Sequence, residues 1–83
     1  MNVIQHAGLE LRREDADAEV AFWALLGFAE VEPPEPLRER SRWVERGGAQ
    51  IHLLYDEDPV VPAQGHVAVV AEDYDAAIAR LRA

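Results

Sequence analysis

The three histidines of the chain, His6, His52 and His66, are the residues best suited to chemistry. Neutral imidazoles bind divalent transition metals and also exchange protons near neutral pH. His6 and His66 lie at matching places in two similar stretches, 4–11 and 64–71, each followed by an aspartate and a helical pattern. This similarity indicates a repeated strand-helix unit that brings two histidines into equivalent positions.

Strand periodicity predicts where these histidines point. Side chains alternate between the two faces of a strand, so Ala7, Leu9 and Leu11 share the apolar face opposite His6. The same alternation applies to His52 and His66, so we expect all three histidines on the sheet face away from the helices. A single histidine in a strand is usually a surface or hydrogen-bonded residue, but three on one predicted face favour a shared metal site.

A hairpin over residues 41–55 adds neighbours to this face. If Gly47-Gly48 is its two-residue turn, Trp43 lies opposite His52 and Glu45 lies opposite Gln50. Trp43 is commonly a packing residue at such a strand centre. On a concave, mixed polar and aromatic surface, however, Trp43 and Gln50 are the candidates for substrate contact.

The remaining elements follow from turn and cap residues. Asp15 is expected to cap a helix that ends near Leu26, with Gly27 beyond its end, and Asp73 to cap a last helix through Leu81. The expected fold class is α+β: one domain over 1–83, with a βαβββ module (1–55), a linker (56–65) and the strand-helix start of a second module (66–83). The expected core comprises Leu9, Leu11, Trp23, Leu26, Ile51, Leu53, Val67, Val69 and Ile78.

Composition excludes several functions. The net charge of −8 argues against binding to nucleic acid or to an anionic membrane surface. The chain has no cysteine, so it has neither disulfides nor thiolate ligands, and no run of apolar residues is long enough to span a membrane. No signal peptide is visible at the N-terminus, and the expected location is the cytoplasm.

Four stretches in order resemble the vicinal oxygen chelate superfamily, which includes glyoxalase I, bleomycin-resistance proteins and extradiol dioxygenases. They are Ile4-Gln5-His6, Ala21-Phe22-Trp23-Ala24-Leu25-Leu26-Gly27-Phe28, Gly48-Ala49-Gln50-Ile51-His52-Leu53-Leu54 and Gly65-His66-Val67-Ala68-Val69-Val70. The resemblance spans most of the chain except the proline-rich loop at 33–36. It implies a cup built from two βαβββ modules, either within one chain or across a dimer.

The resemblance also implies a ligand set. His6, His52 and His66 match positions that carry metal ligands in enzymes of the superfamily, and three histidines would favour zinc, nickel or iron. The fourth ligand, usually a glutamate on the last strand of the second module, has no counterpart before Ala83. This departure leaves the metal site incomplete and suggests a truncated version of a longer protein.

Several functions fit this resemblance. The leading interpretation is a glyoxalase-like metalloenzyme, of the lyase or isomerase type, acting on a small substrate with adjacent oxygens. The alternative is a metal-free small-molecule binding protein of the bleomycin-resistance type, and a further alternative is an iron-dependent dioxygenase relative. The sequence names no catalytic residue. Because so short a chain leaves the second module unfinished, we expect a homodimer in which strands from both chains pair, and exchange of segment 66–83 between protomers is one form that it can take.

Overall fold

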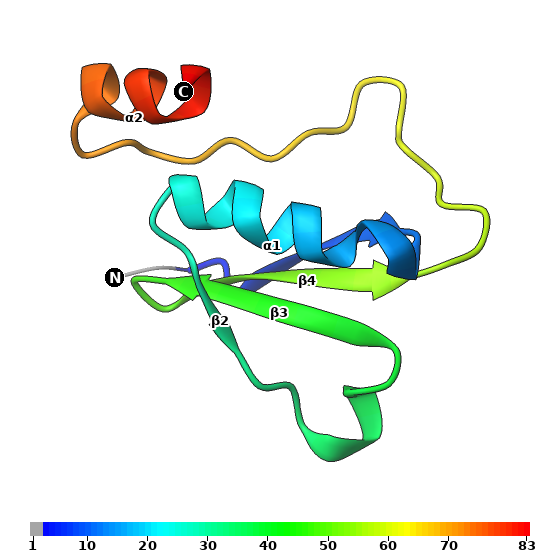
Figure 1. Ribbon diagram of the computed structural model, residues 1–83. Coiled ribbons are helices and arrows are strands. Elements are labelled where there is room, and N and C mark those ends of the chain that lie inside the picture. The colour runs from blue at the N-terminus through cyan, green and yellow to red at the C-terminus, as the bar shows by residue number, and fades with distance from the viewer. Residues whose placement is uncertain (1–2) are drawn as a thin grey trace.

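A four-stranded sheet covered on one side by helices forms the protein (Figure 1). The structure is a computed structural model that describes residues 3–83. The elements are β1 (His6–Leu11), a 3-10 turn (Arg13–Asp15), α1 (Ala16–Leu25), β2 (Ala29–Val31), a second 3-10 turn (Glu35–Leu37), β3 (Ser41–Arg46), β4 (Ala49–Tyr55) and α2 (Tyr74–Arg82). The strand order is β1-β4-β3-β2, with β1 parallel to β4 and the other pairs antiparallel. The α+β class and the βαβββ order predicted from the sequence are confirmed.

The C-terminus of α1 is capped by hydrogen bonds, whereas its N-terminus has no side-chain cap. Gly27 has a φ of +89°, Gly27 N–H donates to the Ala24 carbonyl at 3.1 Å, and Phe28 N–H donates to the Trp23 carbonyl at 3.1 Å. This Schellman motif confirms the predicted C-terminus. Asp15 makes no side-chain capping bond, because the preceding 3-10 turn runs into α1 and leaves Asp15 with a helical backbone (φ −94°, ψ −1°). Asp15 therefore precedes α1 as predicted, but its side chain does not cap the helix.

The hairpin between β3 and β4 sets the register of the sheet. Gly47 and Gly48 have φ of +58° and +83°, the positive pair that a two-residue hairpin turn requires. Trp43 pairs with His52 and Glu45 with Gln50, as predicted. The hairpin therefore places these four side chains together on one face.

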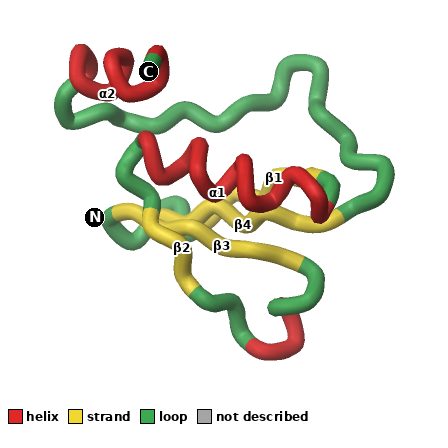
Figure 2. Tube along the Cα trace, in the orientation of Figure 1, coloured by secondary structure: helices red, strands yellow, loops and turns green. Residues whose placement is uncertain are grey.

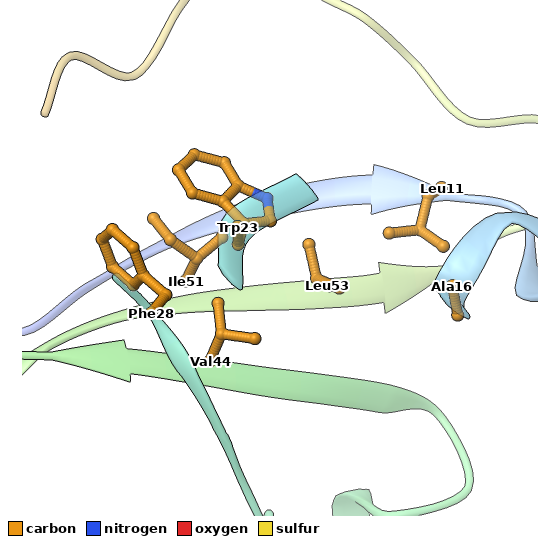
Figure 3. Close-up of a cluster of buried hydrophobic side chains, with 7 residues drawn as sticks. All are labelled: Leu11, Ala16, Trp23, Phe28, Val44, Ile51 and Leu53. Atoms are coloured by element: carbon orange, nitrogen blue, oxygen red, sulfur yellow. The ribbon is translucent and has the colours of Figure 1, made fainter. Parts of the chain in front are cut away.

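The core lies between the sheet and α1 (Figure 3). Val44 and Leu53 are fully buried, and Trp23 packs edge-on against Phe28 with ring centroids 5.3 Å apart. Of the predicted core, Leu11, Trp23, Ile51 and Leu53 are buried, while Leu9, Leu26, Val67 and Val69 pack against it half-buried. Ile78 is half-buried on α2, and Val44 and Phe28 are core residues that the prediction omitted.

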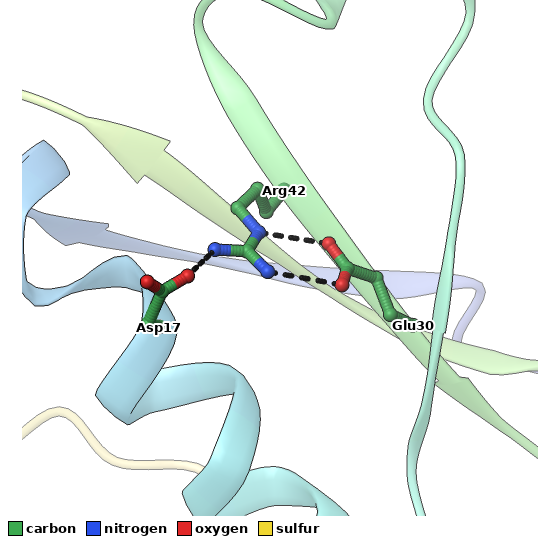
Figure 4. A network of polar contacts seen from close by, with 3 residues as sticks. All are labelled: Asp17, Glu30 and Arg42. Atoms are coloured by element: carbon green, nitrogen blue, oxygen red, sulfur yellow. Dashed lines mark hydrogen bonds and ion pairs between the residues drawn. The ribbon is translucent and has the colours of Figure 1, made fainter.

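A three-residue ionic network joins α1 to the sheet (Figure 4). The Arg42 guanidinium on β3 donates to both carboxylate oxygens of Glu30 on β2, at 2.8 and 3.0 Å, and to Asp17 on α1 at 2.5 Å. The hydrogen bond from Arg42 holds the pKa of Glu30 below its ordinary value of 4.5. Arg42 thus connects three elements on the helix-covered side of the sheet.

The segment after β4 departs from the prediction. Residues 66–71 are extended but form no strand, because the chain returns over the helix side of the sheet instead of along the free edge of β1 (Figure 2). Val67 and Val69 still turn inward, and His66, Ala68 and Val70 are exposed. Arg46 holds this segment by donating to the carbonyls of Leu26, at 2.8 Å, and Val70.

The last helix begins as the sequence predicts. Asp73 Oδ1 accepts from the Ala76 N–H at 3.0 Å, which confirms Asp73 as the cap of α2. No helix in the described part of the chain is long and apolar enough to cross a membrane. The division into 1–55, 56–65 and 66–83 stays a prediction.

Candidate functional site

The face of the sheet opposite α1 is not covered by α1, α2 or residues 66–83, which all lie on the other side (Figures 1 and 2). We call it the open face. Strand alternation places on it the side chains of His6 and Glu10 from β1, Gln50, His52 and Leu54 from β4, and Trp43 and Glu45 from β3. The open face therefore carries two of the three histidines and both predicted substrate-contact residues.

Three aromatic rings stack across three adjacent strands of the open face. The Trp43 and His52 rings lie 3.7 Å apart at an interplanar angle of 4°, and the His6 and His52 rings lie 4.0 Å apart at 12°. Because β4 lies between β3 and β1, His52 is the middle ring. His52 is only 8% exposed, whereas His6 is exposed and ends the stack at the solvent.

Gly8 makes room for this stack. It pairs directly with His52, while His6 pairs with Gln50 and so approaches His52 diagonally. A side chain at Gly8 would occupy the place beside His52, and its Cβ would lie 3.2 Å from Leu54 Cδ1. The absence of a side chain at Gly8 therefore allows the His6 ring to lie over His52.

Hydrogen bonds fix the polar edge of the stack. His52 Nε2 lies 2.8 Å from Gln50 Oε1, and Gln50 Nε2 donates to Glu45 Oε1 at 2.9 Å. His6 Nδ1 lies 2.5 Å from Gln5 Oε1. Burial, and to a lesser extent the nearby charge of His6, lower the pKa of His52 below its ordinary value of 6.5, so His52 is neutral at pH 7.

The indole nitrogen of Trp43 has a different environment. Its Nε1 is buried and makes no hydrogen bond within residues 3–83. A buried donor without a partner costs free energy, so a ligand or partner group that reached it would gain affinity. Trp43 therefore has a polar group to offer in addition to its ring.

His66 does not join the other two histidines. It lies on the helix side of the sheet, beside a hollow of about 520 Å³ that Ala7, Phe28 and Ile51 also line. Its Nδ1 lies 2.9 Å from the Gln64 carbonyl. The expectation that all three histidines share one face is wrong for His66, because residues 66–71 pack over the helix side instead of extending the sheet.

The arrangement of His6 and His52 bears on metal binding. Imidazole ligands direct an in-plane lone pair at a metal about 2.0–2.1 Å away, and catalytic zinc sites use three protein ligands. Two parallel rings 4.0 Å apart cannot both meet this condition at one ion. Among the described residues, no three histidine, aspartate or glutamate side chains are grouped for a metal. As arranged, the open face does not fit a resident transition metal.

Comparison with known proteins bears on the fold. The chain matches no protein-family profile and no curated protein sequence. A crystal structure of a Bacillus anthracis protein ascribed to the glyoxalase family superposes with a TM-score of 0.72 at 21% identity, covering 99% of this chain and 69% of that one. The fold is glyoxalase-like.

Two residues of the open face were not among the sequence candidates. Glu45 orients Gln50 through a hydrogen bond, and its position opposite Gln50 was the available signal. For Gly8 the only signal in the sequence was a glycine within a predicted strand, which often marks the close approach of another group. The position of Glu45 follows from the register of the β3–β4 hairpin, and that of Gly8 from the parallel pairing of β1 with β4.

Proposed function

We propose that this glyoxalase-like domain binds a small planar molecule on its open face, against the stack of Trp43, His52 and His6. The stack is the observation that carries the proposal, because it lines the open face with three nearly parallel rings and its end ring, His6, is exposed, so a flat molecule can lie against it. Stacked aromatic pairs contribute about 0.5–1.5 kcal/mol beyond the area that they bury. Polar groups at the ring edges would orient the ligand.

The charge of the open face limits the ligand further. The open face carries two carboxylates, Glu10 and Glu45, and no arginine side chain shares this face of β1, β3 or β4. The whole chain is also acidic, with a net charge of −8. A neutral or cationic ligand therefore fits better than an anionic one. This preference differs from that of a site built to hold a carboxylate or phosphate.

Metal-dependent chemistry of the lyase or isomerase type is the second candidate, favoured by the closeness of His6 and His52. Such chemistry requires rotation of the His6 or His52 imidazole and a third metal ligand in addition to these two. With His66 on the helix side, that ligand would come from a second chain or from a repositioned C-terminal segment. For the dioxygenase alternative, the third ligand would be a carboxylate.

Binding measurements on matched variants test the proposal. We expect planar heteroaromatic fragments to bind the wild type and to bind Trp43→Leu and His52→Leu at least about tenfold more weakly, which corresponds to 1.4 kcal/mol. Phe22→Ala and His66→Leu are the controls, since both residues lie away from the open face. Equal binding by all four variants would refute the proposal.

Calorimetric titration with zinc and nickel distinguishes the two candidates. If the open face binds ligands without metal, neither ion should bind tightly, and the wild type and His6→Ala should give the same response to both ions. Tight zinc or nickel binding that His6→Ala and His52→Ala abolish would favour the metalloenzyme. Such binding should weaken at acid pH, because a protonated imidazole cannot bind a metal.

A further inference from the structure

We propose that Glu45 and Gln50 are positioning residues that hold His52 in its Nε2–H tautomer, so that Nδ1 is the nitrogen His52 offers as a hydrogen-bond acceptor. Glu45 lies on β3, and Gln50 and His52 lie on β4. This tautomer is a property of the free protein. The class of ligand that it would bind rests on the proposed function.

The hydrogen-bond chain determines the direction of each bond. An ionised carboxylate can only accept, so the atom of Gln50 that lies 2.9 Å from Glu45 Oε1 must be the NH₂ group. The carbonyl oxygen of the same amide is then turned toward His52, 2.8 Å from its Nε2. A carbonyl oxygen also only accepts, so His52 Nε2 carries the proton, and in the neutral ring Nδ1 does not.

The backbone keeps these three groups in place. Glu45 and Gln50 are directly paired across the hairpin, and Gln50 and His52 are two residues apart on the same face of β4. The His52 ring is held between Trp43 and His6 and is 8% exposed, so rotation about its side chain would disrupt both stacking contacts. The tautomer is therefore set by three side chains and by the packing around the ring.

This arrangement selects a class of ligand. An unprotonated Nδ1 accepts a hydrogen bond from an O–H or N–H group, and it could take up that proton if the group were acidic enough. The negative charge of Glu45, acting through the polarised amide of Gln50, strengthens the acceptor. The chemistry fits a flat molecule with a donor at its edge, such as a phenol, an enol or a heteroaromatic N–H.

Long-range ¹H–¹⁵N spectra of the free, labelled protein at pH 8.5 test the tautomer, because protonated and unprotonated ring nitrogens have well-separated shifts. We expect His52 to have a protonated Nε2 and an unprotonated Nδ1. His66 is an internal control with the opposite expectation, since its Nδ1 lies 2.9 Å from the Gln64 carbonyl and must donate to it. A wild-type His52 with a protonated Nδ1 would overturn the proposal.

Two variants test the positioning role. In Glu45→Gln the amide of residue 50 loses its fixed orientation, and in Gln50→Leu it is absent, so both should move the His52 nitrogens toward a mixture of tautomers. Glu57→Gln removes the same charge at an exposed place away from the open face and should leave His52 unchanged. An unchanged signal of the buried Trp23 indole reports that each variant is folded.

Unchanged His52 shifts in both folded variants would show that Glu45 and Gln50 do not position the ring. These spectra need no ligand, so they stand whether or not a planar molecule binds the open face. The ligand class has its own comparison, between a phenol and its methyl ether. The phenol should bind more tightly to the wild type, and equal affinities would remove the acceptor role of Nδ1 while leaving the tautomer in place.

Discussion

Trp43 and His52 lie face to face on neighbouring strands, with ring centroids 3.7 Å apart and an interplanar angle of 4°. The contact follows from their direct pairing in the hairpin, which the two glycines of the turn define. It removes the imidazole from water and leaves it between two rings. Burial of this kind disfavours the charged form of a histidine.

The pH dependence of stability should report this burial. The pKa of His52 is lowered in the folded protein, so below about pH 6.5 the unfolded chain binds a proton that the folded chain does not. The free energy of unfolding should therefore fall as pH decreases from about 6.5 toward the lower folded pKa. Above pH 6.5 both states are neutral at His52, and this residue contributes no slope.

Chemical unfolding of wild type and His52→Gln between pH 8 and pH 5.5 measures the effect. The variant keeps a neutral polar group at position 52 and should lose less stability over this range. Identical pH dependence in the two proteins would mean that His52 protonates as readily in the folded state as in the unfolded state.

Trp23 should contribute more to the free energy of unfolding than Phe22, its neighbour on α1. Trp23 is 6% exposed and contacts Phe28, whereas Phe22 is 42% exposed. We expect Trp23→Ala to lower the free energy of unfolding by about 3–5 kcal/mol, the usual cost of a large buried aromatic. Phe22→Ala should cost about 1 kcal/mol or less. Denaturant titrations giving similar losses for both would contradict the helix phase described above.

Arg42 and Glu30 should be coupled, whereas Arg42 and Asp17 should not. The first pair has two hydrogen bonds and side-chain exposures of 27% and 42%, but the Asp17 side chain is 95% exposed. Double-mutant cycles with Arg42→Met should give about 0.5–1 kcal/mol with Glu30→Gln and close to zero with Asp17→Asn. Because Arg42 lowers the pKa of Glu30, the first coupling should disappear as pH falls below about 4.5. A larger coupling to Asp17 would reverse this assignment.

The homodimer also stays a prediction, and exposed apolar side chains and strand edges are the surfaces through which two chains would associate. The open face and its margin expose Ile4 (68%) and Leu54 (40%), and the outer edges of β1 and β2 have no strand beside them in the described part of the chain. Light scattering at micromolar concentration should give twice the chain mass of 9.3 kDa. A stable monomer would contradict dimerisation, and a dimer that survives deletion of residues 66–83 would contradict exchange of that segment.

Local signals in the sequence were sufficient for much of the fold. Gly27, the Gly47-Gly48 turn and Asp73 each fix a backbone geometry through their own chemistry, so the helix ends and the hairpin register could be predicted. The parallel partner of β1 and the path of residues 66–71 depend on contacts between distant parts of the chain. For this reason the prediction brought His6, His52, Trp43 and Gln50 together correctly but misplaced His66.

Protein-observed NMR with planar heteroaromatic fragments measures ligand binding to the open face residue by residue, and the chain contains its own controls. Its two tryptophans and three histidines give separate indole and imidazole signals. If the open face binds ligands, fragments should shift the signals of Trp43, His52 and His6 and leave those of Trp23 and His66 unchanged. Shifts confined to Trp23 and His66, or no shift with any fragment, would contradict the account.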